Sequence, residues 1–131
     1  MLTVTDHLGQ LAPAVRAIAK AARAAVKAAE PRATEVAYQS KPPRSKSAMW
    51  KLVRYDLGDE EVAGIGVFAT YAVLYLYRGV ELDDGAGLLS GGGKAMRSIR
   101  LETPGDAARP AVKKVLRAAF RLGGARAPTI R

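Results

Sequence analysis

Apolar residues recur at three- and four-residue steps along the first quarter of the chain, which is the spacing of one face of a helix. The pattern indicates helix from Asp6 to Glu30 and predicts its regular part over 11–29. Pro13 fits the first turn of such a helix, and Pro31 ends it. The apolar positions that define this face are Leu8, Leu11, Val15, Ile18, Ala22, Val26 and Ala29.

From Trp50 onward the pattern changes to short β-branched and aromatic runs, which are typical of strands. The runs 62–69 and 71–78 adjoin each other and therefore predict a tight antiparallel hairpin. Gly64 and Gly66 fall on one side of the first run, which predicts the close approach of another backbone, with the alanine-rich helix as the expected neighbour. The predicted strands are 50–55, 62–69, 71–78 and 96–101, with a short additional strand over 34–38.

After a turn at 103–106 the spacing becomes helical again and predicts a second helix over 110–122. Gly123 and Gly124 are predicted to stop this helix and to leave 123–131 as a frayed tail. Residues 40–48 lack periodicity and predict an exposed loop. Strands flanked by terminal helices indicate the α+β class. We therefore expect a single domain over 1–131, with a mainly antiparallel sheet of about four or five strands packed by an N-terminal and a C-terminal helix.

The composition excludes several kinds of site and activity. The chain of 131 residues has room for one hydrophobic core, and it contains no cysteine, which excludes disulfides and zinc sites built on sulfur. No apolar run is as long as a membrane span, and the N-terminus lacks the pattern of a signal peptide, so we expect a cytoplasmic protein without a membrane partner. The single histidine, His7, is expected at a helix start, where it would cap the helix or face solvent. Because no nucleophile–histidine–carboxylate pattern is present, the sequence predicts a protein that is not an enzyme.

The formal net charge of +9 is unevenly distributed. Residues 1–54 carry ten basic and three acidic side chains, residues 91–131 carry ten and two, and residues 55–90 carry one and seven. Such a polarised chain is expected to attract anionic partners. Basic residues also follow one face of each predicted helix, where they either bind nucleic-acid phosphates non-specifically or form an ordinary solvated face. These stripes are Arg16, Lys20, Arg23 and Lys27 on the first helix, and Lys113, Arg117 and Arg121 on the second.

A glycine-rich loop precedes the last predicted strand and is a candidate anion site. Successive glycines let backbone N–H groups turn inward, and a neighbouring ammonium or guanidinium group would add positive charge for a phosphate or carboxylate. The alternative is a flexible loop that needs positive φ. The candidate residues are Gly91, Gly92, Gly93, Lys94, Arg97 and Arg100.

Acidic residues flank the predicted hairpin and are candidate metal ligands. The start of its first strand and the end of its second lie at the same edge of the sheet, so carboxylates from two segments could converge there. Carboxylate oxygens suit hard cations, iron included, although the same residues could simply occupy solvent-exposed turns. The candidate ligands are Asp59, Glu60, Glu61, Glu81, Asp83 and Asp84.

The segments 77–84, 87–89 and 91–97 together combine a strand ending in glycine, an acidic turn, a leucine-glycine loop and a glycine-lysine step before a basic strand. In these features, and in the segment 30–38, the chain resembles the YdhG-like family of small domains, most of unknown function. The resemblance implies an α+β domain. Because some members are described as frataxin-like iron chaperones, it also implies iron as a candidate cofactor.

The sequence thus predicts a small intracellular binding protein, monomeric or homodimeric, for an anionic small molecule or an acidic partner. A frataxin-like iron-binding chaperone is one alternative. Non-specific nucleic-acid association through the basic helix faces is the other.

Overall fold

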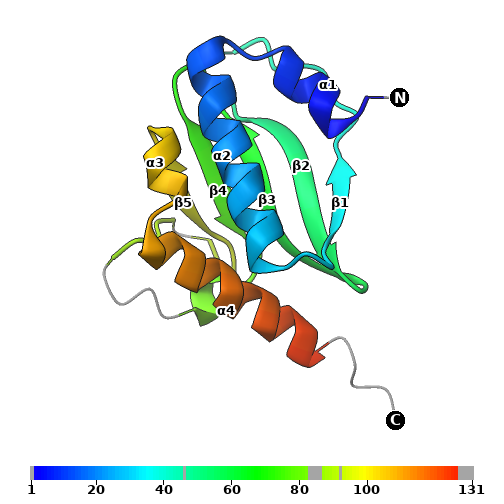
Figure 1. Ribbon diagram of the computed structural model, residues 1–131, viewed down its shortest axis with the longest axis vertical. Helices are drawn as coiled ribbons and strands as arrows, with labels where there is room; N and C mark the ends of the chain where they lie inside the picture. The colour runs from blue at the N-terminus through cyan, green and yellow to red at the C-terminus, as the bar shows by residue number, and fades with distance from the viewer. Residues whose placement is uncertain (1, 46, 83–86, 92, 127–131) are drawn as a thin grey trace.

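A computed structural model describes residues 2–45, 47–82, 87–91 and 93–126 (Figure 1). Its centre is a five-stranded antiparallel sheet in which the strands lie side by side in chain order. This arrangement confirms the predicted α+β class and antiparallel sheet. The strands are β1 (Thr34–Ala37), β2 (Trp50–Leu57), β3 (Glu60–Val67), β4 (Ala72–Leu76) and β5 (Arg97–Leu101).

Two long helices lie across one face of the sheet, as Figure 1 shows, and they are the predicted N-terminal and C-terminal helices. The helical elements are α1 (Val4–Gly9), α2 (Pro13–Ala29), the 3-10 helix η1 (Gly79–Glu81), α3 (Pro104–Ala107) and α4 (Pro110–Arg126). No helix in the described part of the chain is both long enough and apolar enough to cross a lipid bilayer.

The hydrophobic core lies between the helix layer and the sheet. Helix α2 begins with Pro13 at a position that needs no backbone donor, and its alanines let it lie close to the strands. Val26 of α2, Leu74 of β4 and Leu116 of α4 are all fully buried. Each such aliphatic side chain stabilises the fold by about 1.5–3 kcal/mol relative to an exposed one.

The expectation that a helix packs against Gly64 and Gly66 is wrong. These glycines lie on the opposite face of the sheet, where side chains cover them. A Cβ atom on Gly64 would lie 2.2 Å from Cζ of Tyr75, and one on Gly66 would lie 2.5 Å from Sδ of Met49. The pattern correctly indicated a close approach, but aromatic and thioether side chains make it.

The predicted end of the second helix is also wrong, because α4 continues through Gly123 and Gly124 to Arg126. A Cβ on Gly123 would lie 3.0 Å from Cγ2 of Val62. Glycine at this position therefore allows α4 to pass close to β3, and it does not act as a stop. The remaining residues of the predicted tail, 127–131, lie outside the described residues.

The expectation that His7 caps a helix or faces solvent is wrong. It lies in α1, a short helix capped by reciprocal hydrogen bonds between Thr3 and Asp6. The imidazole is fully buried, contacts the carbonyl oxygen of Tyr38 through Nε2, and meets the ring of Trp50 edge-on with 5.1 Å between ring centroids. Its role is therefore to pack α1 against the start of β2.

Candidate functional site

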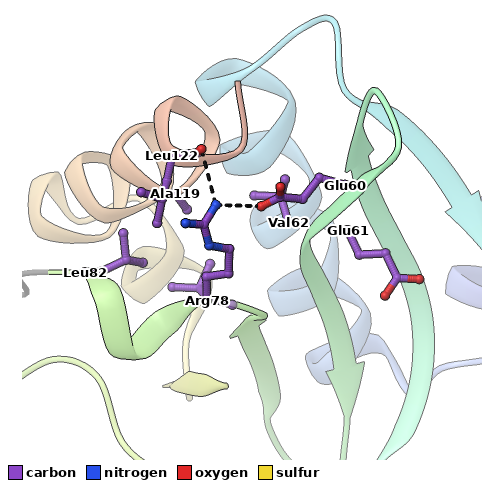
Figure 2. Close-up of a pocket in the computed structure, with 8 residues that line it drawn as sticks. Glu60, Glu61, Val62, Arg78, Leu82, Ala119 and Leu122 are labelled. Atoms are coloured by element: carbon purple, nitrogen blue, oxygen red, sulfur yellow. Dashed lines mark hydrogen bonds and ion pairs between the residues drawn. The ribbon is translucent and has the colours of Figure 1, made fainter. Parts of the chain in front are cut away.

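The acidic edge of the sheet is built around an arginine. Arg78, directly after β4, donates from Nη1 to Oε2 of Glu60 at 2.9 Å and binds both carboxylate oxygens of Glu81 at 2.7 Å. Nη1 also donates to the carbonyl oxygen of Leu122 near the C-terminal end of α4 at 3.4 Å. Figure 2 shows this guanidinium between Glu60 and Leu122. The hydrogen bonds that Arg78 donates to Glu81 and Glu60 raise the pKa of Arg78, so the group stays charged.

The space beside Arg78 is too small for a ligand. Its volume is about 10 Å³, room for roughly one water molecule. Apolar side chains of Val62, Leu82 and Ala119 close it from the strand, the 3-10 helix and α4. The cluster therefore joins elements of the fold and leaves no room for a substrate.

A second arginine, Arg54 on β2, makes a similar arrangement, with β3 between it and β4. Arg54 binds Asp56 through two nitrogens at 2.8 and 3.0 Å, and its Nη1 lies 3.4 Å from Glu61. The hydrogen bonds with Asp56 raise the pKa of Arg54. Glu60 and Glu81 thus share Arg78, and Glu61 pairs with Arg54, so guanidinium groups of the same chain lie among these carboxylates.

Among the described residues, no group of three metal-ligating side chains is close enough to hold an ion. Glu60, Glu61 and Glu81 pair with arginines, and Asp59 is exposed in the β2–β3 turn. Two of the predicted ligands, Asp83 and Asp84, lie outside the described residues. Iron binding stays a prediction.

The glycine-rich loop directs carbonyl oxygens toward one of its predicted anion ligands. Nη1 of Arg97 donates to the carbonyl oxygens of Gly93 at 2.6 Å and Met96 at 2.8 Å. Gly91 has φ of +127°, a conformation that favours glycine. Lys94 is exposed, and Gly92 lies outside the described residues. Arg97 therefore stabilises the loop, and the anion site stays a prediction.

Arg100, the last predicted anion ligand, belongs to an aromatic stack. Its guanidinium lies 3.8 Å from the ring centroid of Tyr71, which stacks on Phe68 with 4.7 Å between centroids and an interplanar angle of 15°. Arg100 also pairs with Glu102 at 2.9 Å, with both side chains more than half exposed. Arg100 and Arg97 therefore make different contacts, although both lie on β5.

Tyrosines on the open face of the sheet lie against each other. The hydroxyls of Tyr38 and Tyr77 are 3.1 Å apart, and Lys51 Nζ lies 5.9 Å from the ring centroids of Tyr38 and Tyr75. Burial is the main cause of the raised pKa values of Tyr75 and Tyr77. Tyr75 and Tyr77 therefore stay neutral at physiological pH.

The basic stripe on α2 is only partly free. Arg16 donates to the carbonyl oxygens of Leu8, Gly9 and Leu11 at 2.8–3.2 Å and so closes the end of α1. Arg23 binds both oxygens of Glu35 at 2.8 Å. Lys20 and Lys27 are exposed and, within the described part of the chain, form no ion pair.

The basic stripe on α4 is entirely exposed. Lys113, Arg117 and Arg121 recur every four residues on the outer face, and none pairs with a carboxylate among the described residues. Lys114, which the sequence reasoning did not include, is exposed beside them. Neither α2 nor α4 contains an acidic residue. The helix layer therefore presents a cationic surface, here called the α4 face and defined by Lys113, Lys114, Arg117 and Arg121.

Comparisons with protein-family models, with curated proteins and with solved structures find no match to this chain. The resemblance to the YdhG-like family therefore stays a prediction.

Proposed function

We propose that this protein is a non-enzymatic module that binds nucleic acid, without reading base sequence, through the α4 face. The observation that carries the proposal is that acidic side chains around the sheet are paired, whereas the basic side chains of the α4 face are not paired within the described part of the chain. The carboxylates of Glu35, Asp56, Glu60, Glu61 and Glu81 pair with arginines around the sheet, whereas the cations of the α4 face have no such partners among the described residues.

The spacing of the α4 face suits a phosphate backbone. Residues four apart on a helix advance about 6 Å along its axis. One strand of a DNA duplex carries a phosphate for about every 3.4 Å of its axis. With α4 along the duplex axis, Lys113, Arg117 and Arg121 therefore match about every second phosphate of one strand, and Lys114 adds a fourth cation beside the row.

The mode of binding follows from the same geometry. Contacts from lysines and arginines to phosphate oxygens carry no information about base sequence. The sequence contains no helix-turn-helix, zinc-finger or RNP-type motif. We therefore expect similar affinity for duplexes of different sequence and a steep decrease of affinity with salt.

Fluorescence anisotropy with a labelled DNA duplex tests the proposal. The double variant Lys113→Gln/Arg117→Gln should bind several-fold more weakly than the parent at low salt. The matched control is Arg32→Gln/Lys51→Gln, which removes the same charge from exposed positions outside α4 and should bind like the parent. Equal weakening in both double variants would show that net charge alone is responsible, and it would overturn the α4 face as the binding surface.

A further inference from the structure

A groove of about 270 Å³ lies where α2 begins, beside the β3–β4 turn and the loop that precedes β2. Three segments far apart in the sequence line it, and none of its described lining residues is charged. Leu11 and Val15 form the helix side, Pro42 and Pro43 the loop side, and Phe68 the hairpin side. This volume is close to the lower end of the range for small-ligand pockets.

The aromatic walls of the groove are held in place. Trp50 donates from its indole nitrogen to the carbonyl oxygen of Ser40 at 3.3 Å and meets the buried ring of His7 edge-on. Phe68 is half-buried and is backed by the stacked ring of Tyr71. Because these rings are already fixed, a flat apolar group can enter without the cost of ordering them.

The charge around the groove is positive. The partly buried guanidinium of Arg16, next to the lining residues Leu11 and Ala12, hydrogen-bonds only carbonyl oxygens among the described residues, so no carboxylate neutralises it. Lys41 and Arg44 are exposed and adjoin the lining prolines in sequence. No side chain caps the N-terminus of α2 at Ala12, which adds a partial positive charge. An apolar slot with a cationic border fits a flat ring that carries an anion.

We propose that this groove takes one unstacked base of a single-stranded nucleic acid, with an adjoining phosphate near the start of α2. The proposal rests on the proposed function and adds to it a preference for single strands over duplexes. Base stacking on an aromatic side chain is tolerant of sequence, because every base has a π-face. Gln10, whose side-chain amide forms no hydrogen bond within the described part of the chain, lines the groove and offers a donor and an acceptor to the base edge.

The test compares a labelled oligothymidine of about twelve nucleotides, within the site sizes of single-strand binders, with a duplex of equal length. Phe68→Leu keeps an apolar side chain but removes the ring. Ala69→Trp fills the groove from an exposed position and keeps the test decisive if Phe68→Leu does not fold. Val80→Leu, at an apolar position that is 50% exposed and does not line the groove, is the control.

Both groove variants should lose about tenfold in affinity for the single strand, whereas their affinity for the duplex and both affinities of the control should stay unchanged. Unchanged single-strand affinity, or equal losses for both ligands, would overturn the groove proposal and leave the α4 face intact. A parent protein that binds the duplex but not the single strand would also overturn it. A parent that binds neither ligand would overturn the proposed function, and the groove proposal with it.

Discussion

Arg23, Arg54 and Arg78 each hold one carboxylate through two nitrogens, at 2.7–3.0 Å. The planar guanidinium fork matches the two oxygens of a carboxylate, which the point charge of a lysine cannot do. Within the described part of the chain, no lysine forms an ion pair. Counting charges along the sequence could not show this division, because it depends on which strands lie side by side.

Gly64 shows how one missing side chain determines local packing. Its replacement by alanine would place Cβ 2.2 Å from the Tyr75 ring, which is 1% exposed and has no free space to move into. We expect Gly64→Ala to lower the free energy of unfolding by about 1–3 kcal/mol, the usual cost of overpacking. Urea denaturation measures the change.

The control for this prediction is Gly9→Ala, since an added Cβ there meets nothing within 4 Å. Its free energy of unfolding should stay the same or rise slightly. Equal stability of the Gly64 and Gly9 variants would mean that Tyr75 does not lie where the structure places it.

At the scale of elements, periodicity predicted the sheet and both long helices, because alternating and helical spacings directly record which side chains are buried. It did not separate α1 from α2 and it missed α3, because both short helices lack a repeat. It also could not predict the groove, because Gln10, Pro42 and Phe68 are brought together only by the tertiary fold. For the candidate site, the sequence indicated the basic stripes on both helices. It could not show which of these cations form ion pairs with carboxylates.

The stability that the contact between α2 and β1 contributes is expected to decrease at low pH. Burial opposes ionisation of Glu35, but hydrogen bonds from Arg23 and Tyr55 outweigh it and keep the pKa of Glu35 below its ordinary value of 4.5. A carboxyl group whose pKa is lower in the folded state contributes stability above its unfolded pKa and loses it as the pH falls through the folded pKa. The free energy of unfolding should therefore decrease below about pH 4.5.

Urea denaturation at several pH values, with Glu35→Gln beside the parent, tests this expectation. The variant should be less stable at neutral pH and should lose less stability on acidification, because it has no carboxyl to protonate at this contact. Parallel stability curves for the two proteins over the acidic range would contradict a contribution from Glu35.

At the scale of the whole molecule, the two faces carry different surfaces. The helices cover one face of the sheet (Figure 1). The open face carries packed tyrosines with Lys51, while the helix layer carries the α4 face. The acidic middle of the chain does not cancel this surface, because Glu60, Glu61 and Glu81 pair with Arg54 and Arg78. The anionic partner proposed above would therefore meet the cations of the α4 face rather than these carboxylates.

The salt dependence of duplex binding tests the α4 face most directly. Each phosphate contact contributes about −0.9 to the slope of log affinity against log salt concentration. Lys113→Gln/Arg117→Gln should make that slope shallower by about two, because it removes two contacts, and Arg32→Gln/Lys51→Gln should leave the slope of the parent unchanged. A slope that is the same in the parent and the α4 variant would contradict the claim that these helix cations contact the phosphates.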